Sequence, residues 1–429
     1  RVCDLSDDGG TWAHTPPPPG IVAVDPVLGR LAFGTAPEAA PRVSFHYGTA
    51  LAIGGGEYGR AETFSLPAEP VETVTMPASL QAALDARTPG TPLEITDNGR
   101  YEESLTLALA PGERFELRAA DERRPTLVLG GDLVISGGDE HAEVSLNGLL
   151  LAGGTLRLTG EVRRLRLRHC TLVPGLSLTV EGEPTAPTSP SLVIETGGVP
   201  VEAAPSILGG VRLHPLSRLE ATDSIVDATD SAGVAFASCE APPEGEAEAA
   251  GGTLRLEECT VVGKVHAAQV ELVSNSILDA TLGAGDPWPA PVRVERKQTG
   301  CMRFSYVPDG ARTPRRYRCQ PELEISTRLE AARRALGSPD AILPEADRAA
   351  IRAEVLASLK PAFTSLRLAH PGYGQLRSRC PRQLREGAED EAAMGATHDL
   401  YEPQRLTNLR IRLEEYLRFG LEAGVFLAS

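Results

Sequence analysis

Three aspartates offer the clearest candidate for catalytic chemistry in this sequence. Asp227 and Asp279 follow two copies of one recurring strand phrase, Gly263 takes their position in the copy between them, and Asp223 lies close by. Stacked strands lie about 4.8 Å apart, so the carboxylates of Asp227 and Asp279 would be roughly 10 Å apart. Two carboxylates about 6.5 to 9.5 Å apart act as the acid and the base of inverting glycosidases. The spacing therefore suggests glycan cleavage.

A structural role for these aspartates is the stronger interpretation. An aspartate directly after a strand often caps the turn with its own carboxylate. Aromatic residues make up only 4% of the chain, whereas ligand sites are usually lined by apolar and aromatic side chains. We therefore expect no catalytic residue, and keep Asp223, Asp227 and Asp279 as the weaker catalytic alternative.

Other catalytic or cofactor chemistry finds little support in the sequence. A lyase would need acidic residues around a calcium ion beside an arginine base, and no dense acidic group surrounds the outward candidates Arg166, Arg168 and Arg255. The seven cysteines form no CxxC pair and no zinc-type spacing with histidine. We expect no metal site and no cofactor.

A basic segment with aromatic residues stands out late in the chain. Aromatic rings beside arginines can stack on nucleobases or dock on an acidic protein surface. The formal net charge of −16 argues against nucleic acid, because a protein that follows phosphates needs a positive field. An internal ion-pair network or protein docking is therefore favoured, and the docking candidates are Arg303, Arg312, Arg315, Arg316, Tyr317 and Arg318.

A recurring phrase between Val144 and Thr281 indicates how these residues are positioned. It occurs six times, as NGLLLAGG, HCTLVPG, APSILGG, TDSIVDAT, EECTVVGK and SNSILDAT. Each copy ends a run of alternating apolar residues, a pattern that turns one set of side chains inward. We align two inward columns, the first with Leu149, Thr171, Ser206, Ser224, Thr260 and Ser276, and the second with Leu151, Val173, Leu208, Val226, Val262 and Leu278. Such copies bury their apolar faces only by stacking, so the sequence predicts a parallel β-helix, which is a solenoid.

The chain before this solenoid has its own pattern. Residues 1–70 form an N-terminal β segment, with a hairpin over 21–33 and a further strand over 42–48. The glycine triplet at 54–56 is expected to be a flexible connection, because no P-loop lysine follows it. The fold is thus expected to be mainly β from its first residues.

The solenoid and the C-terminal part complete the expected organisation. Residues 71–284 form the parallel β-helix, and a short helix over 79–86 covers its open end. Residues 285–429 hold a hairpin between Cys301 and Cys319, where a disulfide is conceivable. An α-helical domain follows, with helices over 323–336, 344–359 and 403–419.

The chain resembles a known group of proteins. NGRYEESLTLALAPGERFELRAADERRPTL is similar to the opening coils of pectin-lyase-like right-handed β-helices. Uncharacterised β-helix proteins encoded in bacterial phage-tail-like, contractile-injection-type gene sets resemble the segments DPVLGRLAF, GGGEYGR, GDPWPAPVR, RTPRRYRCQP, MGATHDLYEPQR and NLRIRLEEYLRFGLEAGVF. The resemblance spans nearly the whole chain, and implies a right-handed solenoid that serves as a structural part of a particle. It assigns no catalytic residues, and the helical C-terminal part differs from a trimeric spike tip.

Two functions follow as hypotheses. We expect a non-enzymatic structural or assembly component of a phage-tail-like particle, in which the solenoid is a stiff scaffold and the C-terminal domain docks to other particle proteins. The alternative is a polysaccharide-binding or polysaccharide-cleaving module, a glycoside hydrolase or lyase.

The sequence says less about membrane association and cellular location. No stretch approaches the ~18 to 20 apolar residues of a membrane span, so none is expected. Because the chain starts at Arg1 and its cysteines are mostly unpaired, we expect a partial or processed chain made in a reducing bacterial cytoplasm. Its final location, on the particle or outside the cell, stays open.

Overall fold

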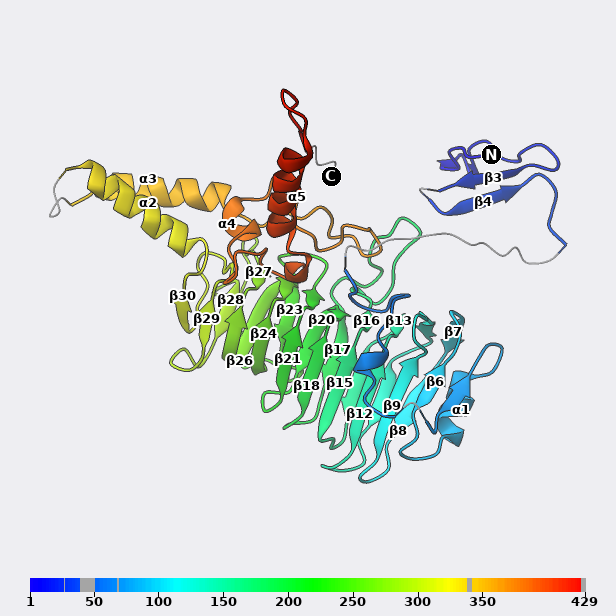
Figure 1. Ribbon diagram of the computed structural model, residues 1–429. Helices are drawn as coiled ribbons and strands as arrows, with labels where there is room; N and C mark the ends of the chain where they lie inside the picture. Colours follow the sequence, from blue (N-terminus) through cyan, green and yellow to red (C-terminus); the bar gives the residue numbers. More distant parts are fainter. Residues whose placement is uncertain (27, 39–50, 68, 338–341, 426–429) are drawn as a thin grey trace.

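The computed structural model describes residues 1–26, 28–38, 51–67, 69–337 and 342–425. The chain is mainly β, with long parallel sheets in its middle part and a few helices towards the C-terminus (Figure 1). The expectation of a mainly β chain with parallel strands is confirmed. The strand expected over 42–48 lies outside the described residues.

Parallel strand pairs form three ladders, which the chain visits in turn. Within the described ranges, the first ladder is an eight-stranded sheet made of β7 (Arg100–Glu103), β10 (Thr126–Leu129), β13 (Leu150–Ala152), β16 (Thr171–Leu172), β19 (Ile207–Leu208), β22 (Ile225–Asp227), β25 (Thr260–Val262) and β27 (Ile277–Asp279). The second ladder consists of β8 (Thr106–Ala108), β11 (Leu133–Ser136), β14 (Leu156–Thr159), β17 (Pro190–Ile194), β20 (Gly210–Leu213), β23 (Val234–Ala237), the first part of β26 (Lys264–Ser274) and β28 (Val292–Val294).

The third ladder is the longest and shares β26 with the second. It consists of β5 (Glu72–Val74), β6 (Leu93–Ile95), β9 (Arg114–Ala119), β12 (Glu143–Asn147), β15 (Arg164–Arg168), β18 (Pro200–Ala204), β21 (Arg218–Thr222), β24 (Gly251–Glu257), the second part of β26, β29 (Cys301–Arg303) and β30 (Arg315–Tyr317). Because β26 pairs with both β28 and β29, the two ladders join into one sheet.

The apolar interior repeats in register from one strand to the next. Leu117 pairs with Leu146, which pairs with Leu167, and all three side chains are buried. Successive side chains of a strand point to opposite faces, and one apolar cluster gathers buried residues from all three ladders. Burying a leucine or valine side chain stabilises a protein by about 1.5 to 3 kcal/mol. This shared interior is therefore the main source of stability.

A two-residue turn joins the third-ladder strands to the first-ladder strands. Its first residue has a positive φ at His169, Asp223, Glu258 and Asn275, a strained conformation that costs of order 1–3 kcal/mol. Its second residue is buried and small in most copies, and this turn column contains Leu149, Cys170, Ser206, Ser224, Cys259, Ser276 and Ser305. The serine hydroxyls accept backbone N–H groups from the preceding copy, as from the Cys170 N–H to Ser206 Oγ at 3.1 Å. Buried donors that would otherwise lack a partner are thereby satisfied.

This register corrects the expected columns by one residue in two of the copies. Thr171 and Thr260 pair with isoleucines of neighbouring copies, so Cys170 and Cys259 share the turn column with the serines. A small buried cysteine takes the place of serine there, and the expected alignment matched threonine to serine instead. The second column shifts likewise and contains Leu151, Leu172, Leu208, Val226, Val261 and Leu278.

The N-terminal strands pair antiparallel. β1 (Asp7–Asp8) pairs with β2 (Thr11–Trp12), and β3 (Val22–Asp25) pairs with β4 (Arg30–Phe33). The second pair confirms the expected hairpin. A short 3-10 helix, η1 (Ala61–Thr63), follows before the ladders begin.

Helix α1 (Leu80–Ala86) closes the N-terminal end of the ladders, as expected. Ser79 caps it, because the Ser79 Oγ accepts the backbone N–H of Ala82. Leu80 and Leu84 join the apolar interior. The helix thereby covers side chains that the first strands would expose.

The C-terminal part is helical, as expected. Its helices are α2 (Glu322–Ala335), α3 (Glu345–Ser358), α4 (Arg382–Arg385), η2 (His398–Leu400) and α5 (Glu402–Tyr416). A second apolar cluster contains Ile325, Val355 and Leu384 and packs against Ile277 of the first ladder. Among the described residues, none of these helices combines the length and the apolar run that a membrane-spanning helix requires.

The hairpin expected between Cys301 and Cys319 is wrong. β29 and β30 pair in parallel, whereas the two strands of a hairpin are antiparallel. The third ladder therefore continues to Tyr317, beyond the end expected at residue 284. Both cysteines are free. The Pro-Asp-Gly turn that suggested a reversal lies instead in the connection between two parallel strands.

The interior gives a test of which side chains hold the ladders together. Leu256 is fully buried, whereas Leu216 is 78% exposed. We expect Leu256→Ala to lower the free energy of unfolding by about 2 to 5 kcal/mol, because it leaves a cavity. The matched change Leu216→Ala should stay within about 0.5 kcal/mol. Urea unfolding measures both, and equal effects would contradict the burial pattern.

Candidate functional site

Two segments from distant parts of the chain cover the outer face of the first ladder. We call residues 51–60 the N-terminal cover and residues 362–400 the C-terminal cover. Figure 1 shows the N-terminal segment passing beside β13 and β16, and the C-terminal helices beside β27. The two covers meet over the ladder, where one apolar cluster joins Ile207 and Ile225 with Ala396, Ile53, Leu368 and Tyr373.

The N-terminal cover is held by backbone hydrogen bonds to the ladder. The Gly55 N–H donates to Thr171 Oγ1 at 3.0 Å. The neighbouring Gly54 N–H donates to the Pro205 carbonyl at 3.1 Å. Thr171 lies where other copies carry an isoleucine, so its hydroxyl marks the point of attachment.

The C-terminal cover is held by the same arrangement. The Ala396 N–H donates to Thr260 Oγ1 at 3.0 Å, and the Gly395 N–H donates to the Asn275 carbonyl at 2.7 Å. Thr171 and Thr260 follow the two cysteines of the turn column. The Cys-Thr pair is therefore the sequence mark of the two copies to which a cover binds.

Glycine is required at both attachment points. Gly54 has a φ of +70° and Gly395 a φ of +90°. A Cβ atom would lie 2.4 Å from Thr171 Oγ1 at Gly54, and 2.5 Å from Thr260 Oγ1 at Gly395. The expectation of a flexible connection at 54–56 is wrong, because the triplet packs closely on the ladder.

Arg60 fastens the end of the N-terminal cover. The residue is buried, and its guanidinium donates to the carbonyl oxygens of Gly56, Tyr58, Ala120 and Arg123. These carbonyl oxygens satisfy the two Nη groups of the buried cation, whereas its Nε has no hydrogen-bond partner.

The aspartates aligned for glycan cleavage lie on this covered face. Asp227 is 2% exposed; its carboxylate accepts the Tyr373 hydroxyl at 2.6 Å and the Thr229 N–H at 2.7 Å. It thus caps its turn beneath the C-terminal cover, and burial raises its pKa. Asp279 shares its register column, with Val262 between them and not Gly263. Burial raises the pKa of Asp279 to about 6.

The cavity beside Asp227 is small. It has a volume of about 200 Å³, and its walls include Pro174, Leu178, Thr229 and Leu368. Pockets for drug-sized ligands usually enclose about 300–1,000 Å³. The cavity lies between the 178–184 loop and residues 366–368 of the C-terminal cover, which Arg367 joins through an ion pair to Glu183.

Asp223 lies apart from the other two aspartates, in an acidic cluster. Its register partner is Glu258, since Thr222 pairs with Glu257 directly before them. His398 and Asp399 of η2 complete the group, and potential ligand atoms of Glu258, His398 and Asp399 all lie within 4.8 Å of one another. Burial, then the carboxylates of Asp399 and Glu258, raise the pKa of Asp223 to about 7.

Sequence reasoning named Asp223 but missed this cluster. His398 and Asp399 come from the C-terminal cover, far from Glu258 along the chain, and only the fold brings them together. The Thr-His-Asp sequence that follows Gly395 was the available signal. It lies directly after Ala396, whose N–H fixes the cover on Thr260.

The candidate docking residues divide into two groups. Arg303 and Arg316 make internal ion pairs, to Glu389 at 3.4 Å and to Glu322 at 2.5 Å. The exposed members are Arg312, Arg315, Tyr317 and Arg318. Tyr317 is 58% exposed, and its ring contacts Phe304 edge-on at a centroid distance of 5.7 Å.

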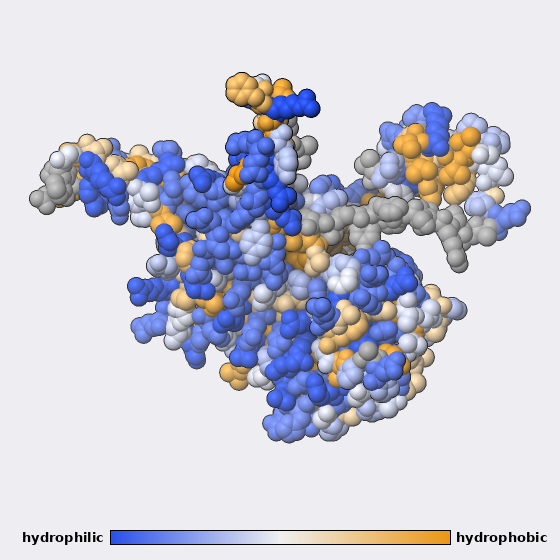
Figure 2. Space-filling view, in the orientation of Figure 1, coloured by the Kyte–Doolittle hydropathy of each residue, from blue (hydrophilic) through white to orange (hydrophobic). Residues whose placement is uncertain are grey.

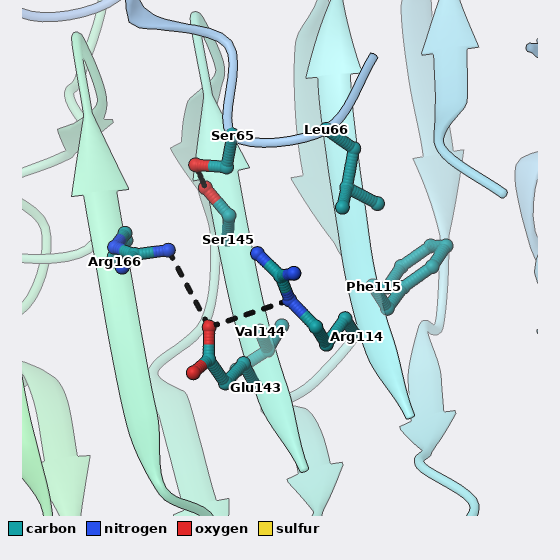
Figure 3. A pocket seen from close by; sticks show the side chains of 8 residues that line it. All are labelled: Ser65, Leu66, Arg114, Phe115, Glu143, Val144, Ser145 and Arg166. Carbon is teal, nitrogen blue, oxygen red and sulfur yellow. Dashed lines mark hydrogen bonds and ion pairs between the residues drawn. The ribbon is translucent and has the colours of Figure 1, made fainter. Parts of the chain in front are cut away.

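The outer face of the third ladder carries alternating charges. Figure 3 shows Glu143 between Arg114 and Arg166, with ion-pair distances of 3.7 and 3.5 Å. The adjoining hollow has a volume of about 10 Å³, which is room for about one water molecule. Arg166 and Arg168 also pair with Glu202. Arg166 and Arg168, which were candidate lyase bases, thus form ion pairs with glutamates of neighbouring strands.

Thr260 allows the attachment of the C-terminal cover to be tested. Thr260→Val keeps the shape but leaves the buried Ala396 N–H without an acceptor, at a cost of about 1–3 kcal/mol. We expect faster amide hydrogen exchange at Ala396 and faster proteolysis of the C-terminal cover. Thr126 holds the same register position in β10, where no described cover residue donates to it. Thr126→Val is the matched control, and equal effects would refute the attachment.

Asp279 predicts a pH dependence of stability. Its folded-state pKa of about 6 lies above the ordinary value of 3.8. The unfolded chain therefore ionises first as the pH rises from about 4 to 6, and the folded state loses stability over that range. We expect Asp279→Asn to raise the free energy of unfolding by about 1–3 kcal/mol at pH 7.5 and to change it little at pH 4. Equal shifts at both pH values would contradict this assignment.

Comparison of the chain with protein-family models, with curated proteins and with solved structures finds no match. A function must therefore be derived from the residues of the chain and their geometry. The covered outer face of the first ladder is the feature that constrains that function most.

Proposed function

We propose that this chain is a non-enzymatic structural component of a phage-tail-like, contractile-injection-type particle, built on a right-handed parallel β-helix that acts as a stiff scaffold. The observation that carries the proposal is the covered outer face of the first ladder. Asp227 lies beneath Tyr373 there and accepts its hydroxyl, so one of the two carboxylates aligned for glycan chemistry instead caps a turn under the C-terminal cover.

The strand pairing supports a stiff body. Nearly all ladder strands have hydrogen-bonded neighbours on both sides, and one apolar cluster runs through all three ladders. Bending such a stack would break strand pairs and would also expose the apolar interior. Stacked repeats of this kind provide long surfaces with little conformational freedom.

The last strand supports docking to another protein. Among the described residues β30 pairs only with β29. The other edge of β30 therefore presents unpaired backbone groups. Another protein can add a strand at such an edge. Arg315, Tyr317 and Arg318 flank this edge and are exposed. An acidic particle protein would suit this surface.

Helix α5 offers a second contact surface. None of the residues of α5 is buried, and Tyr416 and Phe419 are exposed. Figure 2 shows apolar atoms at the tip beyond α5, above a mostly hydrophilic body. Exposed apolar patches rimmed by polar residues commonly mark protein contacts.

Particle binding tests this proposal. Arg315→Glu should lower the fraction of full-length chain that sediments with the particle by about tenfold, a loss of about 1.4 kcal/mol. The control is Arg100→Glu, because Arg100 is an exposed arginine in β7 at the opposite end of the ladders. Equal loss in both variants would contradict docking through β30. Release of sugar from a glycan panel by the unmodified chain would favour the polysaccharide-cleaving alternative.

A further inference from the structure

We propose that Glu258, His398 and Asp399, with Asp223 beside them, bind one divalent cation of the first transition row, which fastens the C-terminal cover to the ladders. This site goes beyond the scaffold function and does not depend on it. Its ligands come from two separate parts of the chain.

The spacing of the donor atoms fits a single ion. Potential ligand atoms of Glu258, His398 and Asp399 lie within 4.8 Å of one another. Nitrogen and oxygen ligands about 2.0–2.2 Å from Zn²⁺ are separated from each other by roughly 3 to 4.5 Å. A small adjustment of the exposed Asp399 side chain would bring all three donors within that range.

The histidine is oriented as a metal ligand. His398 is 3% exposed, and its Nδ1 lies 3.0 Å from the Ala393 carbonyl oxygen. A carbonyl accepts only, so Nδ1 carries the proton. Its Nε2 lies 3.2 Å from Asp390 Oδ2 and 3.5 Å from Glu258 Oε1. A neutral imidazole would aim its Nε2 lone pair at these two carboxylates, and a cation bound between them would relieve that repulsion.

An independent observation comes from Asp223. One of its carboxylate oxygens is buried and has no hydrogen-bond partner. Among the described residues, no arginine or lysine forms an ion pair with Asp223, Glu258 or Asp399. Buried carboxylates are normally paired or bound to a metal. The cluster thus gathers carboxylates without a basic partner, and one buried Asp223 oxygen remains available as a metal ligand.

The donor set selects the class of metal. Imidazole with two or three carboxylates suits Zn²⁺ or Mn²⁺, whereas Ca²⁺ takes six to eight oxygen ligands. The ion would join turn residues of two neighbouring copies to η2 of the C-terminal cover. It would therefore restrict detachment of the cover without altering the ladders.

Metal binding by the full chain tests this site. After treatment with EDTA, ZnCl₂, MnCl₂ and CaCl₂ are titrated separately by calorimetry, and thermal unfolding is followed with each. We expect one Zn²⁺ or Mn²⁺ per chain and a rise in Tm of about 2 °C or more at saturating metal. Asp399→Asn, which alters an exposed side chain, and His398→Gln should each weaken binding at least tenfold.

A second buried histidine supplies the control. His266 Nε2 lies 2.8 Å from Glu295 Oε1, but Arg293 pairs with the same carboxylate. Glu295→Gln should therefore leave metal binding unchanged. The proposal is overturned if neither Zn²⁺ nor Mn²⁺ binds. Binding of Ca²⁺ alone, or equal binding by Asp399→Asn, would also overturn it.

Discussion

The buried residue at each turn into the first ladder, small in most copies, sets the register on which the structure depends. The residue before it adopts a strained left-handed conformation in several copies, and the serine hydroxyls satisfy backbone donors of the preceding copy. Leu149 is the large exception in this column, and it too is fully buried. Because strand side chains alternate, a slip of one residue would turn the apolar set outward. Register and interior are thus fixed together.

The same turns also shape the outer surface. A residue with a positive φ directs its side chain differently from a strand residue, and the column holds His169, Asp223, Glu258 and Asn275, with Pro205 between the first two. The N-terminal cover meets this column at His169, where the Tyr58 hydroxyl lies 3.0 Å from Nδ1. The C-terminal cover meets it at Glu258 and Asn275. Polar residues in these turns therefore serve attachment.

Much of the fold could be predicted from the sequence, because alternation and stacking are local patterns. The repeated phrases, the capping helix at Ser79 and the C-terminal helices could all be recognised from spacing. The one-residue shift at Cys170 and Cys259 could not, since a cysteine that replaces serine in a turn has no pattern of its own. The parallel pairing of β29 with β30 was hidden by a turn sequence that also occurs in hairpins. The acidic cluster required contacts across the whole chain, which spacing does not contain.

The N-terminal cover has a consequence for synthesis of the chain. Gly55 binds Thr171, which lies 116 residues later. At roughly 5–20 residues per second, the ribosome needs on the order of ten seconds to supply that threonine. During this interval Ile53 has no ladder to pack against. The N-terminal cover is thus made well before the strand that it binds, and a chaperone that shields short apolar segments would act on it before the ladder exists.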